Sequence, residues 1–237
     1  CKLAGIAVLD LSSYFERALG QVRIDSLRAS WLIFGDGFRQ GLTRTIVKRV
    51  FDISAGLLLL ILTLPLMLIT IILIALESGF PIFYRQERVG QGGRIFQVLK
   101  FRSMHADAEK DGQARWASPN DSRVTRVGRF IRKYRIDELP QLLNVLKGDM
   151  SLVGPRPERT FFVDELTRQV PFYAARHSIK PGLTGWAQVR YHYGASQDDA
   201  VKKLQFDLYY VKNHTLFLDL IILFETVVVV VTGRGAP

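Results

Sequence analysis

Two adjacent carboxylates, Asp137 and Glu138, are the side chains of this sequence best suited to chemistry. The residues before them are strongly basic and include Arg132, Lys133 and Arg135. These cations and the positive end of a helix would keep Asp137 ionised and attract an anionic substrate. A carboxylate in such a place can act as a nucleophile toward phosphorus. The same stretch equally allows a structural interpretation, in which Asp137 only caps a helix.

The carboxylates are expected at the start of a short helix. Four leucines recur at helical spacing and predict one buried face of about two turns: Leu139, Leu142, Leu143 and Leu146. Gly148 is expected to end this helix. Asp137 then lies at or near the N-cap, and Pro140 falls within the first turn, where the missing N–H of a proline costs little.

A basic amphipathic helix is predicted immediately upstream. Its cations recur at near-helical spacing: Arg123, Arg126, Arg129, Arg132, Lys133 and Arg135. Three apolar residues are expected on the opposite face: Val127, Phe130 and Ile131. Such a helix is typical of a membrane-surface or phosphate-binding element. The polar residues 105–125 before it are interpreted as a loop.

Two further stretches combine a cation with a rigid backbone. Pro155 and Pro157 restrict the chain on both sides of Arg156, which would pre-set its guanidinium for a phosphate or nucleotide contact. The alternative is an ordinary loop with an exposed arginine. Residues 180–186 repeat the pattern as a rigid turn with a cation and an aromatic ring, and their composition favours neither interpretation.

Residues 81–104 predict a β-hairpin. The strand-like runs Ile82–Tyr84 and Arg94–Leu99 are joined through residues 90–93, three of which are glycine. These glycines fit a hairpin turn better than a phosphate cradle, because no helix pattern follows directly. Residues 100–102 close the second run, and by themselves they are best interpreted as a solvated sheet edge.

Residues 53–76 carry no charge, and this length is about what spans a bilayer core. The stretch is predicted to be a membrane segment, kinked at Pro65, where Thr63 could satisfy a freed carbonyl. Basic residues flank both ends, so the positive charge favours neither direction of crossing. A spanning helix is the commoner structure, whereas the symmetric flanks favour a re-entrant hairpin. Residues 216–231 are interpreted as a helix in the membrane interface.

Composition limits the classes of function. The 237 residues suffice for one sizeable domain with an appendage or for two small domains. A net charge of +10 favours anionic partners such as nucleic acid, nucleotide phosphates or acidic lipid. The single cysteine excludes an internal disulfide, and the four scattered histidines lack the spacing of a structural zinc site. Because it lacks an initial Met and a signal peptide, the chain is interpreted as a piece of a longer protein.

Five motifs, taken in order, resemble those of the bacterial sugar transferases known as monotopic phosphoglycosyl transferases. They are the uncharged stretch with Pro65, Lys100–Met104, Asp137–Gln141, Gly154–Pro157 and Lys180–Gly185, and the resemblance covers residues 46–232.

The resemblance implies an α+β, mainly helical fold, that of a monotopic membrane protein. A re-entrant membrane helix broken at Pro65 and interfacial amphipathic helices would surround a small cytoplasmic catalytic domain. Residues 1–45 would be the tail of a missing upstream Rossmann-like module with a linker, residues 46–80 the re-entrant helix, and residues 81–237 the catalytic domain.

The resemblance also implies a reaction. The enzyme would transfer a sugar-1-phosphate from a UDP-sugar to undecaprenyl phosphate, release UMP, and initiate the synthesis of an exopolysaccharide or another surface glycan. Asp137 would be the nucleophile that forms a covalent aspartyl-phosphosugar intermediate, Glu138 would assist, and both would hold Mg²⁺. The protein would lie at the bacterial inner membrane with its catalytic domain on the cytoplasmic face and with no nucleic-acid partner. The sequence leaves open which sugar is carried and whether copies form a homo-oligomer.

Substrate-binding residues are implied by the same motifs: Lys100, Arg102, Arg132, Pro155, Arg156, Pro157, Lys180 and Thr184. Arg156 corresponds to a position linked in the family to the nucleotide. Two residues depart from the family pattern. Leu64 stands where a serine commonly precedes the proline, and Arg135 stands where a small residue is usual, with a role that the sequence does not assign.

Two other functions are compatible with parts of the sequence. One is a membrane-anchored glycosyltransferase that releases UDP instead of UMP. The other is a non-enzymatic basic module that binds acidic lipid or nucleic acid through residues 123–135. The carboxylate pair argues against the binding module, because acids at the centre of an anion-binding patch weaken it.

Overall fold

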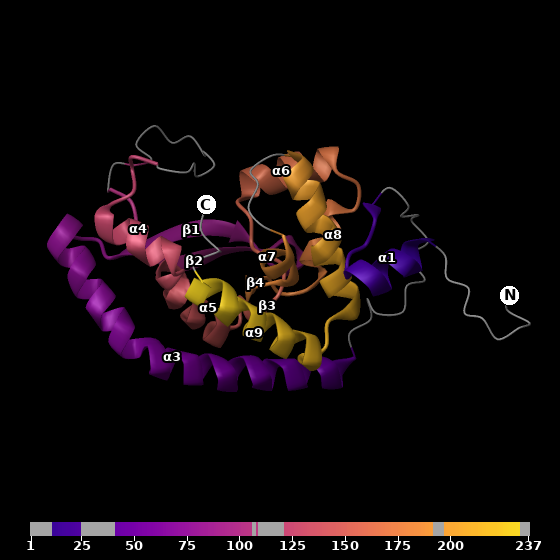
Figure 1. The fold of residues 1–237 in the computed structure, drawn as a ribbon, viewed down its shortest axis with the longest axis horizontal. Helices are drawn as coiled ribbons and strands as arrows, with labels where there is room; N and C mark the ends of the chain where they lie inside the picture. Colours follow the sequence, from indigo (N-terminus) through magenta and orange to yellow (C-terminus); the bar gives the residue numbers. More distant parts are fainter. Residues whose placement is uncertain (1–10, 25–40, 106–107, 109–120, 192–196, 233–237) are drawn as a thin grey trace, which may run out of the picture.

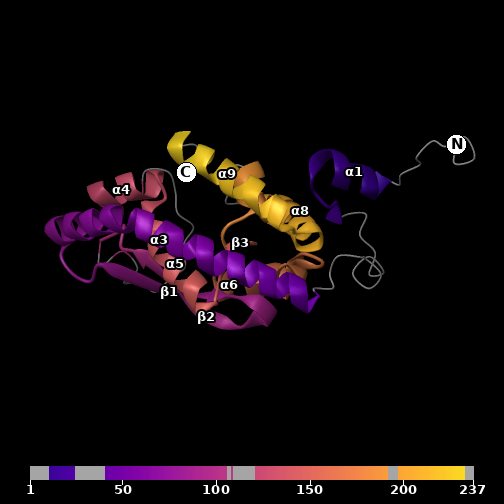
Figure 2. The same ribbon diagram turned by 90° about the horizontal axis from the view of Figure 1, so that it is seen from below.

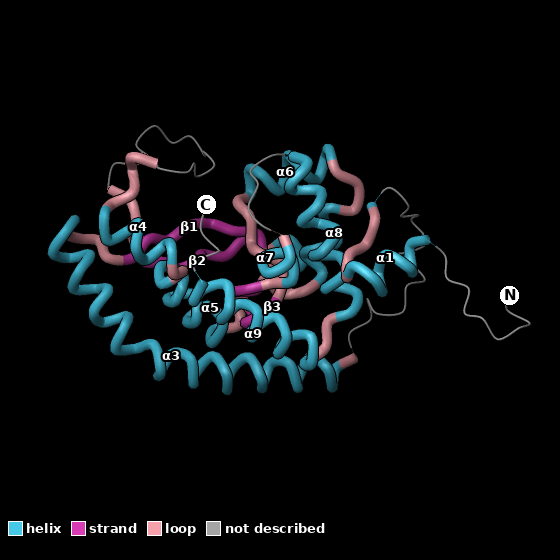
Figure 3. The backbone as a smooth tube through the Cα atoms, viewed as in Figure 1, coloured by secondary structure: helices cyan, strands magenta, loops and turns pink. Residues whose placement is uncertain are grey.

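The computed structural model describes residues 11–24, 41–105, 108, 121–191 and 197–232. Within these ranges the chain is mainly helical, and its short strands form two two-stranded sheets (Figures 1 and 3). In chain order the elements, with 3₁₀ helices written η, are α1 (Leu11–Leu19), α3 (Leu42–Ser78), β1 (Phe83–Val89), η3 (Gln91–Gly93), β2 (Ile95–Phe101), α4 (Arg126–Lys133), η4 (Ile136–Gln141), α5 (Leu142–Lys147), β3 (Ser151–Val153), α6 (Thr160–Gln169), η5 (Tyr173–Ser178), β4 (Gly182–Thr184), α7 (Trp186–Arg190), α8 (Gln197–Asn213) and α9 (Leu216–Thr232).

The longest element is α3, a helix of 37 residues that continues through Pro65. It bends along its length, and most of the other elements lie on its concave side (Figure 1). The Thr63 hydroxyl donates to the Leu59 carbonyl at 2.7 Å. The carbonyl that loses its donor at Pro65 is that of Ile61, so the expectation that Thr63 compensates for the proline is wrong.

The surface of α3 is largely apolar and uncovered. Among the described residues, α3 is the one helix long and apolar enough to cross a membrane, and 17% of its 18-residue apolar window is buried. Exposed side chains occur on both sides of Pro65 and include Leu58, Leu62, Leu68 and Leu76. A core helix of a water-soluble domain would bury such a surface, so this finding agrees with the predicted membrane segment.

Both ends of α3 are tied to the rest of the chain. Near the N-terminus, the Arg49 guanidinium donates to the Val145 carbonyl of α5 at 2.6 Å. At the C-terminus, the Arg102 guanidinium donates to the carbonyls of Ser78 and Gly79 at 2.8 and 2.6 Å. In Figure 2 the α8–α9 pair and the β1–β2 hairpin lie on either side of α3. The two ends of this helix therefore contact one globular part of the chain.

The predicted hairpin is confirmed. β1 and β2 pair antiparallel, and residues 91–93 form the connection between them. The rings of Phe83 and Phe101 stack with their centroids 5.4 Å apart. The interpretation of residues 100–102 as a solvated edge is wrong, because Phe101 and Arg102 are 2% and 6% exposed. The end of β2 packs against η4 and α3, and this packing could not be read from a short run of alternating residues.

The helix predicted after the carboxylates is split in two. Residues 136–141 form a 3₁₀ turn, α5 follows, and Gly148 ends it with a φ of 101°, as predicted. A 3₁₀ helix has about three residues per turn, so it changes the face that the following residues bury. Leu142 and Val145 are buried but Leu143 is 45% exposed, and the predicted four-leucine face is wrong in that respect.

The predicted basic helix is α4. Thr125 caps its N-terminus by accepting a hydrogen bond from the Gly128 N–H at 2.8 Å. Ile131 is buried as expected, but Phe130 is 57% exposed and shares the outer face of the helix with cations. Most of the polar loop expected at residues 105–125 lies outside the described residues.

The main core joins strands and helices that are far apart in sequence. Most of its buried members come from β2, α5, β3, α8 and α9, and they include Val98, Leu142, Leu152, Tyr210 and Ile222. Residues 180–186, predicted as a rigid turn, contain β4, which pairs in parallel with β3. The C-terminal helix expected over 216–231 is confirmed as α9.

Gly128 lies where α4 closely approaches the backbone of Ser103, which follows β2. A Cβ atom at this position would lie 1.9 Å from the Ser103 carbonyl oxygen. Gly128→Ala is therefore expected to destabilise the fold by about 1–3 kcal/mol or more, because two backbone segments would have to separate. Thermal unfolding in detergent measures the effect. Gly41→Ala is the matched control, since a Cβ there meets nothing within 4 Å, and equal unfolding temperatures for the two variants would contradict this contact.

Candidate active site

The 3₁₀ turn η4 carries both carboxylates. Arg135 occupies the N-cap with a left-handed backbone, at a φ of 53°. Asp137 lies inside the first turn and does not hold the N-cap, so the purely capping interpretation of Asp137 is wrong. The Glu138 N–H donates to the Arg135 carbonyl at 3.2 Å, which closes the turn.

The Glu138 carboxylate is the centre of the polar contacts at this turn. Its Oε1 accepts hydrogen bonds from the Lys100 Nζ at 2.9 Å and from the Arg156 Nη2 at 2.7 Å. Its Oε2 lies 3.4 Å from the Arg135 Nη1. Glu138 is 6% exposed, and the three cations compensate a negative charge that would otherwise be costly to bury. They come from β2, from the residue before η4 and from the loop after β3.

The two carboxyl groups differ in acidity. Burial, reinforced by the Glu138 charge, raises the pKa of Asp137 to about 6. Burial would also raise the pKa of Glu138, but Arg156, Lys100 and Arg135 hold this pKa well below its usual value. Glu138 therefore stays ionised as the partner of the cations. Asp137 is therefore more basic than an ordinary aspartate.

Several predicted site residues meet at this carboxylate pair. Lys100 and Arg156 contact Glu138, and the charge of Arg132 acts on Asp137. The two prolines that flank Arg156, at positions 155 and 157, are buried. The hairpin, the end of α4, η4 and the loop after β3 thus converge on one polar centre.

Three predicted substrate-binding residues lie in other surroundings. Arg102 donates to the C-terminal end of α3. The Thr184 hydroxyl is hydrogen-bonded to the Thr226 hydroxyl of α9 at 2.7 Å. Lys180 lies near Arg49, with its pKa lowered by burial and by that neighbouring charge. Their binding roles stay predictions.

The family model described as bacterial sugar transferase matches residues 43–233, which include every element of this site. The chain belongs to this family.

Curated relatives are similar over most of the chain. A protein of Aeromonas hydrophila named UDP-N-acetylgalactosamine-undecaprenyl-phosphate N-acetylgalactosaminephosphotransferase is 48% identical over 236 residues, which cover 100% of this chain and 55% of that protein. A UDP-glucose:undecaprenyl-phosphate glucose-1-phosphate transferase of Caulobacter vibrioides is 46% identical over 191 residues, covering 80% and 71%. A protein of the same name from Escherichia coli is 39% identical over 184 residues, covering 77% and 39%. The chain thus spans about half the length of the Aeromonas relative.

Arg135 is a residue that departs from the family pattern and to which the sequence assigned no role there, and the structure shows two features of it. It supplies the left-handed position before η4, and its guanidinium lies beside Glu138. The spacing of three residues between this cation and the acid was a signal for such a pair.

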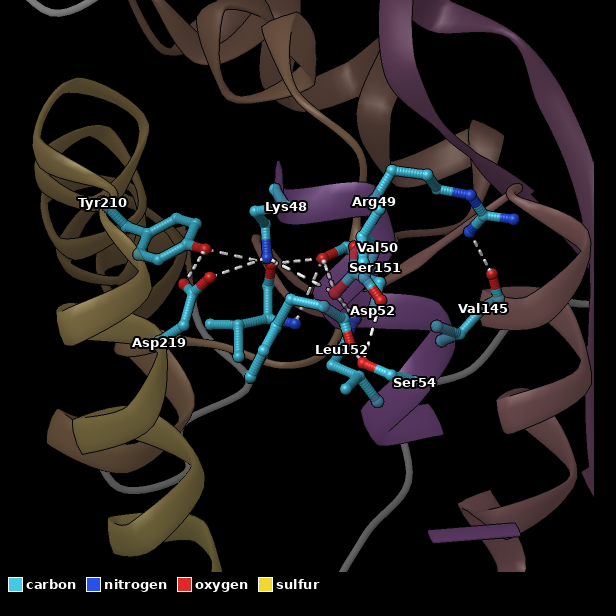
Figure 4. Close-up of polar contacts among 12 residues, drawn as sticks. Lys48, Arg49, Val50, Asp52, Ser54, Val145, Ser151, Leu152, Tyr210 and Asp219 are labelled. Atoms are coloured by element: carbon cyan, nitrogen blue, oxygen red, sulfur yellow. Dashed lines mark hydrogen bonds and ion pairs between the residues drawn. The ribbon is translucent and has the colours of Figure 1, made fainter. Parts of the chain in front are cut away.

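A second polar cluster holds the N-terminal part of α3 against β3 and α9 (Figure 4). The Asp52 Oδ1 accepts hydrogen bonds from the Ser151 hydroxyl at 3.0 Å and from the Leu152 N–H at 3.1 Å. The Lys48 Nζ lies 3.5 Å from the Asp52 Oδ1 and 2.8 Å from the Asp219 Oδ2. Sequence reasoning treated Lys48 only as a flanking charge, because its partner is 171 positions away.

Magnesium was predicted at the carboxylate pair. No group of three or more His, Cys, Asp or Glu side chains in the described residues could hold a metal ion by itself. Mg²⁺ commonly keeps several waters and uses one or two carboxylates together with substrate phosphates. The Asp137–Glu138 pair fits that smaller donor set, with Asp137 the less compensated of the two charges.

Glu138 is expected to make stability depend on pH. Its pKa in the folded state lies well below the ordinary value of 4.5, so its contribution is fully present above that value and is lost as pH falls through the folded-state pKa. Glu138→Gln should lower the thermal unfolding midpoint at neutral pH, because the three cations lose their anion. The variant should also lose less stability than the original protein on further acidification.

Thermal unfolding in detergent, followed from about pH 7 down to about pH 3, measures both effects. Glu165→Gln, on an exposed part of α6, is the matched control. Parallel pH curves for the Glu138→Gln variant and the original protein would show that the three cations do not stabilise an ionised Glu138.

Proposed function

We propose that this chain is the catalytic part of an enzyme that transfers a sugar-1-phosphate from a UDP-sugar to undecaprenyl phosphate and releases UMP, the first step of a surface glycan. The observation that carries the proposal is the pair of adjacent and unequal carboxyl groups, with Glu138 in contact with Lys100 and Arg156 and with the pKa of Asp137 raised. Relatives named as undecaprenyl-phosphate sugar phosphate transferases supply the class of substrate.

In the proposed first step, a carboxylate oxygen of Asp137 attacks the β-phosphorus of the UDP-sugar. The bond from this phosphorus to the oxygen that bridges the two phosphates breaks, and UMP leaves with the electron pair. The sugar phosphate is then held on Asp137 as an acyl phosphate. In the second step an oxygen of undecaprenyl phosphate attacks the same phosphorus, the bond to Asp137 breaks, and the carboxylate is regenerated.

Charge neutralisation is the main task of the other residues, as in phosphoryl transfer generally. Lys100 and Arg156 are the cations nearest to the carboxylate pair, and Glu138 fixes their positions through contacts of 2.9 and 2.7 Å. Asp137 and Glu138 would hold Mg²⁺, which would neutralise charge on the diphosphate when bound.

The geometry of α3 supports a re-entrant arrangement. A straight helix of 37 residues is about 55 Å long, which exceeds the ~30 Å hydrocarbon core. Its N-terminal part is paired with Asp219 of α9, and its C-terminal end accepts hydrogen bonds from Arg102. A spanning helix would separate these two contact regions by the membrane. We therefore propose that α3 enters and leaves the membrane on the cytoplasmic face of the bacterial inner membrane, with its bend at Pro65.

Other apolar surface supports the same placement. α9 exposes Phe217, Phe224 and Val231, and α4 exposes Phe130 among its cations. Helices with such surfaces favour the boundary between headgroups and acyl chains.

Asp137→Asn tests the nucleophile. The variant keeps the size of the side chain but cannot form the acyl phosphate, so UMP release is expected to fall about 10³-fold or more. The assay mixes a panel of UDP-sugars with undecaprenyl phosphate and Mg²⁺ and quantifies UMP and UDP separately. Asp164→Asn, on an exposed part of α6, is the matched control and should retain activity.

Each outcome of this assay decides one point. Normal turnover by Asp137→Asn would contradict the covalent step. UDP as the product would favour a direct glycosyltransferase, and salt-sensitive anion binding with neither nucleotide released would favour a binding module.

Cysteine labelling tests the course of α3. In a Cys1→Ser background, Thr45→Cys places a thiol at an exposed position in the first turn of α3 and Arg85→Cys places one after the helix. Asp164→Cys marks the side of the catalytic part. A re-entrant helix predicts that an impermeant maleimide reaches all three from the cytoplasmic side. Labelling of Thr45→Cys and Arg85→Cys from opposite sides would establish a spanning helix instead.

A further inference from the structure

The loop that carries Arg156 is held by hydrogen bonds to its backbone from four separate donors. The Pro155 carbonyl accepts from the Gly182 N–H at 2.9 Å. The Arg156 carbonyl accepts from the Arg176 Nη2 at 2.9 Å, and the Pro157 carbonyl accepts from the Arg88 Nη1 at 3.1 Å. The next carbonyl, that of Glu158, accepts from the Val89 N–H at 3.0 Å. Four successive peptide groups are therefore fixed from outside the loop.

Two of these donors are arginine side chains that belong to other elements. Arg88 is on β1, where its Nη1 also lies 3.5 Å from the Glu158 Oε2 and its Nη2 donates to the Gln86 Oε1 at 2.6 Å. Arg176 is on η5 and is 5% exposed. Neither side chain contacts the carboxylate pair through a hydrogen bond or ion pair that the structure describes, so both act on the backbone of the loop.

Arg176 is itself tightly held. Its Nη2 lies 2.7 Å from the Asp207 Oδ2 of α8, and its Nη1 donates to the Tyr173 hydroxyl at 2.6 Å. Burial outweighs the attraction of Arg176 and raises the pKa of Asp207 to about 6. A charged pair in this place is costly compared with apolar packing. The planar Arg176 guanidinium donates to the Arg156 carbonyl, and Asp207 and Tyr173 fix the direction of this donor.

We infer that Arg176, together with Arg88, is a positioning residue of the transfer reaction, which holds the backbone of the Pro155–Pro157 loop so that the Arg156 guanidinium stays on Glu138 and faces the substrate diphosphate. This inference rests on the proposed function for the role of Arg156. The prolines restrict φ within the loop, but they do not set the orientation of the whole loop relative to η4. The two arginines supply that orientation from β1 and η5.

A lysine cannot replace either arginine in this role. Its single ammonium group cannot meet three fixed partners in one plane, although it keeps the charge. Arg176→Lys is therefore expected to lower kcat/KM for UMP release by about 100-fold, the order of loss caused by a misplacement of about 1 Å.

A double-mutant cycle separates positioning from general destabilisation. If Arg176 acts through Arg156, Arg176→Lys should have little further effect on kcat/KM in an Arg156→Ala background. Equal fold-losses in both backgrounds, at matched folded fractions, would overturn the inference. Arg88→Lys gives the same cycle from the other side of the loop, and it decides the question if Arg176→Lys does not fold. Arg190→Lys, at the partly exposed ion pair with Glu225, is the matched control and should not be coupled to Arg156.

Amide hydrogen exchange tests the same inference without substrate. The Gly182 and Val89 amides donate to the carbonyls of Pro155 and Glu158, at the two ends of the loop. Exchange of these two amides should rise in Arg176→Lys or Arg88→Lys and should not change in Arg190→Lys. Unchanged exchange at these amides would overturn the positioning role even if turnover fell. Absence of UMP release by the original protein with increased exchange in the variants would contradict the proposed function alone.

Discussion

The buried Glu138 carboxylate, with Lys100, Arg135 and Arg156 around it, is the interaction on which the rest of the site depends. A negative charge at 6% exposure is unstable alone, and three positive charges close together repel one another. The arrangement is stable only when β2, η4 and the loop after β3 are all in place. The same charges make the neighbouring carboxyl group different: Asp137 has a pKa raised to about 6 beside a glutamate held ionised. Two successive acids thereby acquire different pKa values from one set of contacts.

The long apolar helix α3 is fixed to this centre from both ends. Its C-terminal carbonyls are held by Arg102, two residues after the lysine that contacts Glu138. Its N-terminal part is held by the buried contacts of Asp52 and Lys48 with β3 and α9 (Figure 4). These links couple the depth of α3 in a membrane to the position of the carboxylates. In the proposed function, such coupling would hold the carboxylates at the level of a lipid phosphate whose chain lies in the hydrocarbon core.

The loop of Arg156 adds a second level of order behind the site. Its carbonyls are used as acceptors by β1, β4 and η5, so the conformation of this loop is shared with most of the globular part. Gly182 also holds this loop, because its N–H donates to the Pro155 carbonyl. Its stretch, residues 180–186, was predicted from the sequence as a rigid turn. In the proposed reaction, residues that do not touch the substrate would therefore influence the geometry of the transfer.

The sequence alone determined the uncharged helix, the hairpin, the glycine that ends α5 and the motifs of the family, because these depend on local periodicity, turn residues and short-range spacing. It also singled out Asp137 and Glu138 as a pair. Only the tertiary structure decided which charges meet them. Lys100 and Arg156 are 38 and 18 positions from Glu138, Arg102 serves the end of α3, and Arg135 is both a left-handed backbone position and a charge partner. Ion pairs between residues far apart in sequence leave no periodic pattern that could predict them. The 3₁₀ turn also shifts which residues of the following helix face the core. The contacts and burial of the site residues therefore follow from how the elements pack.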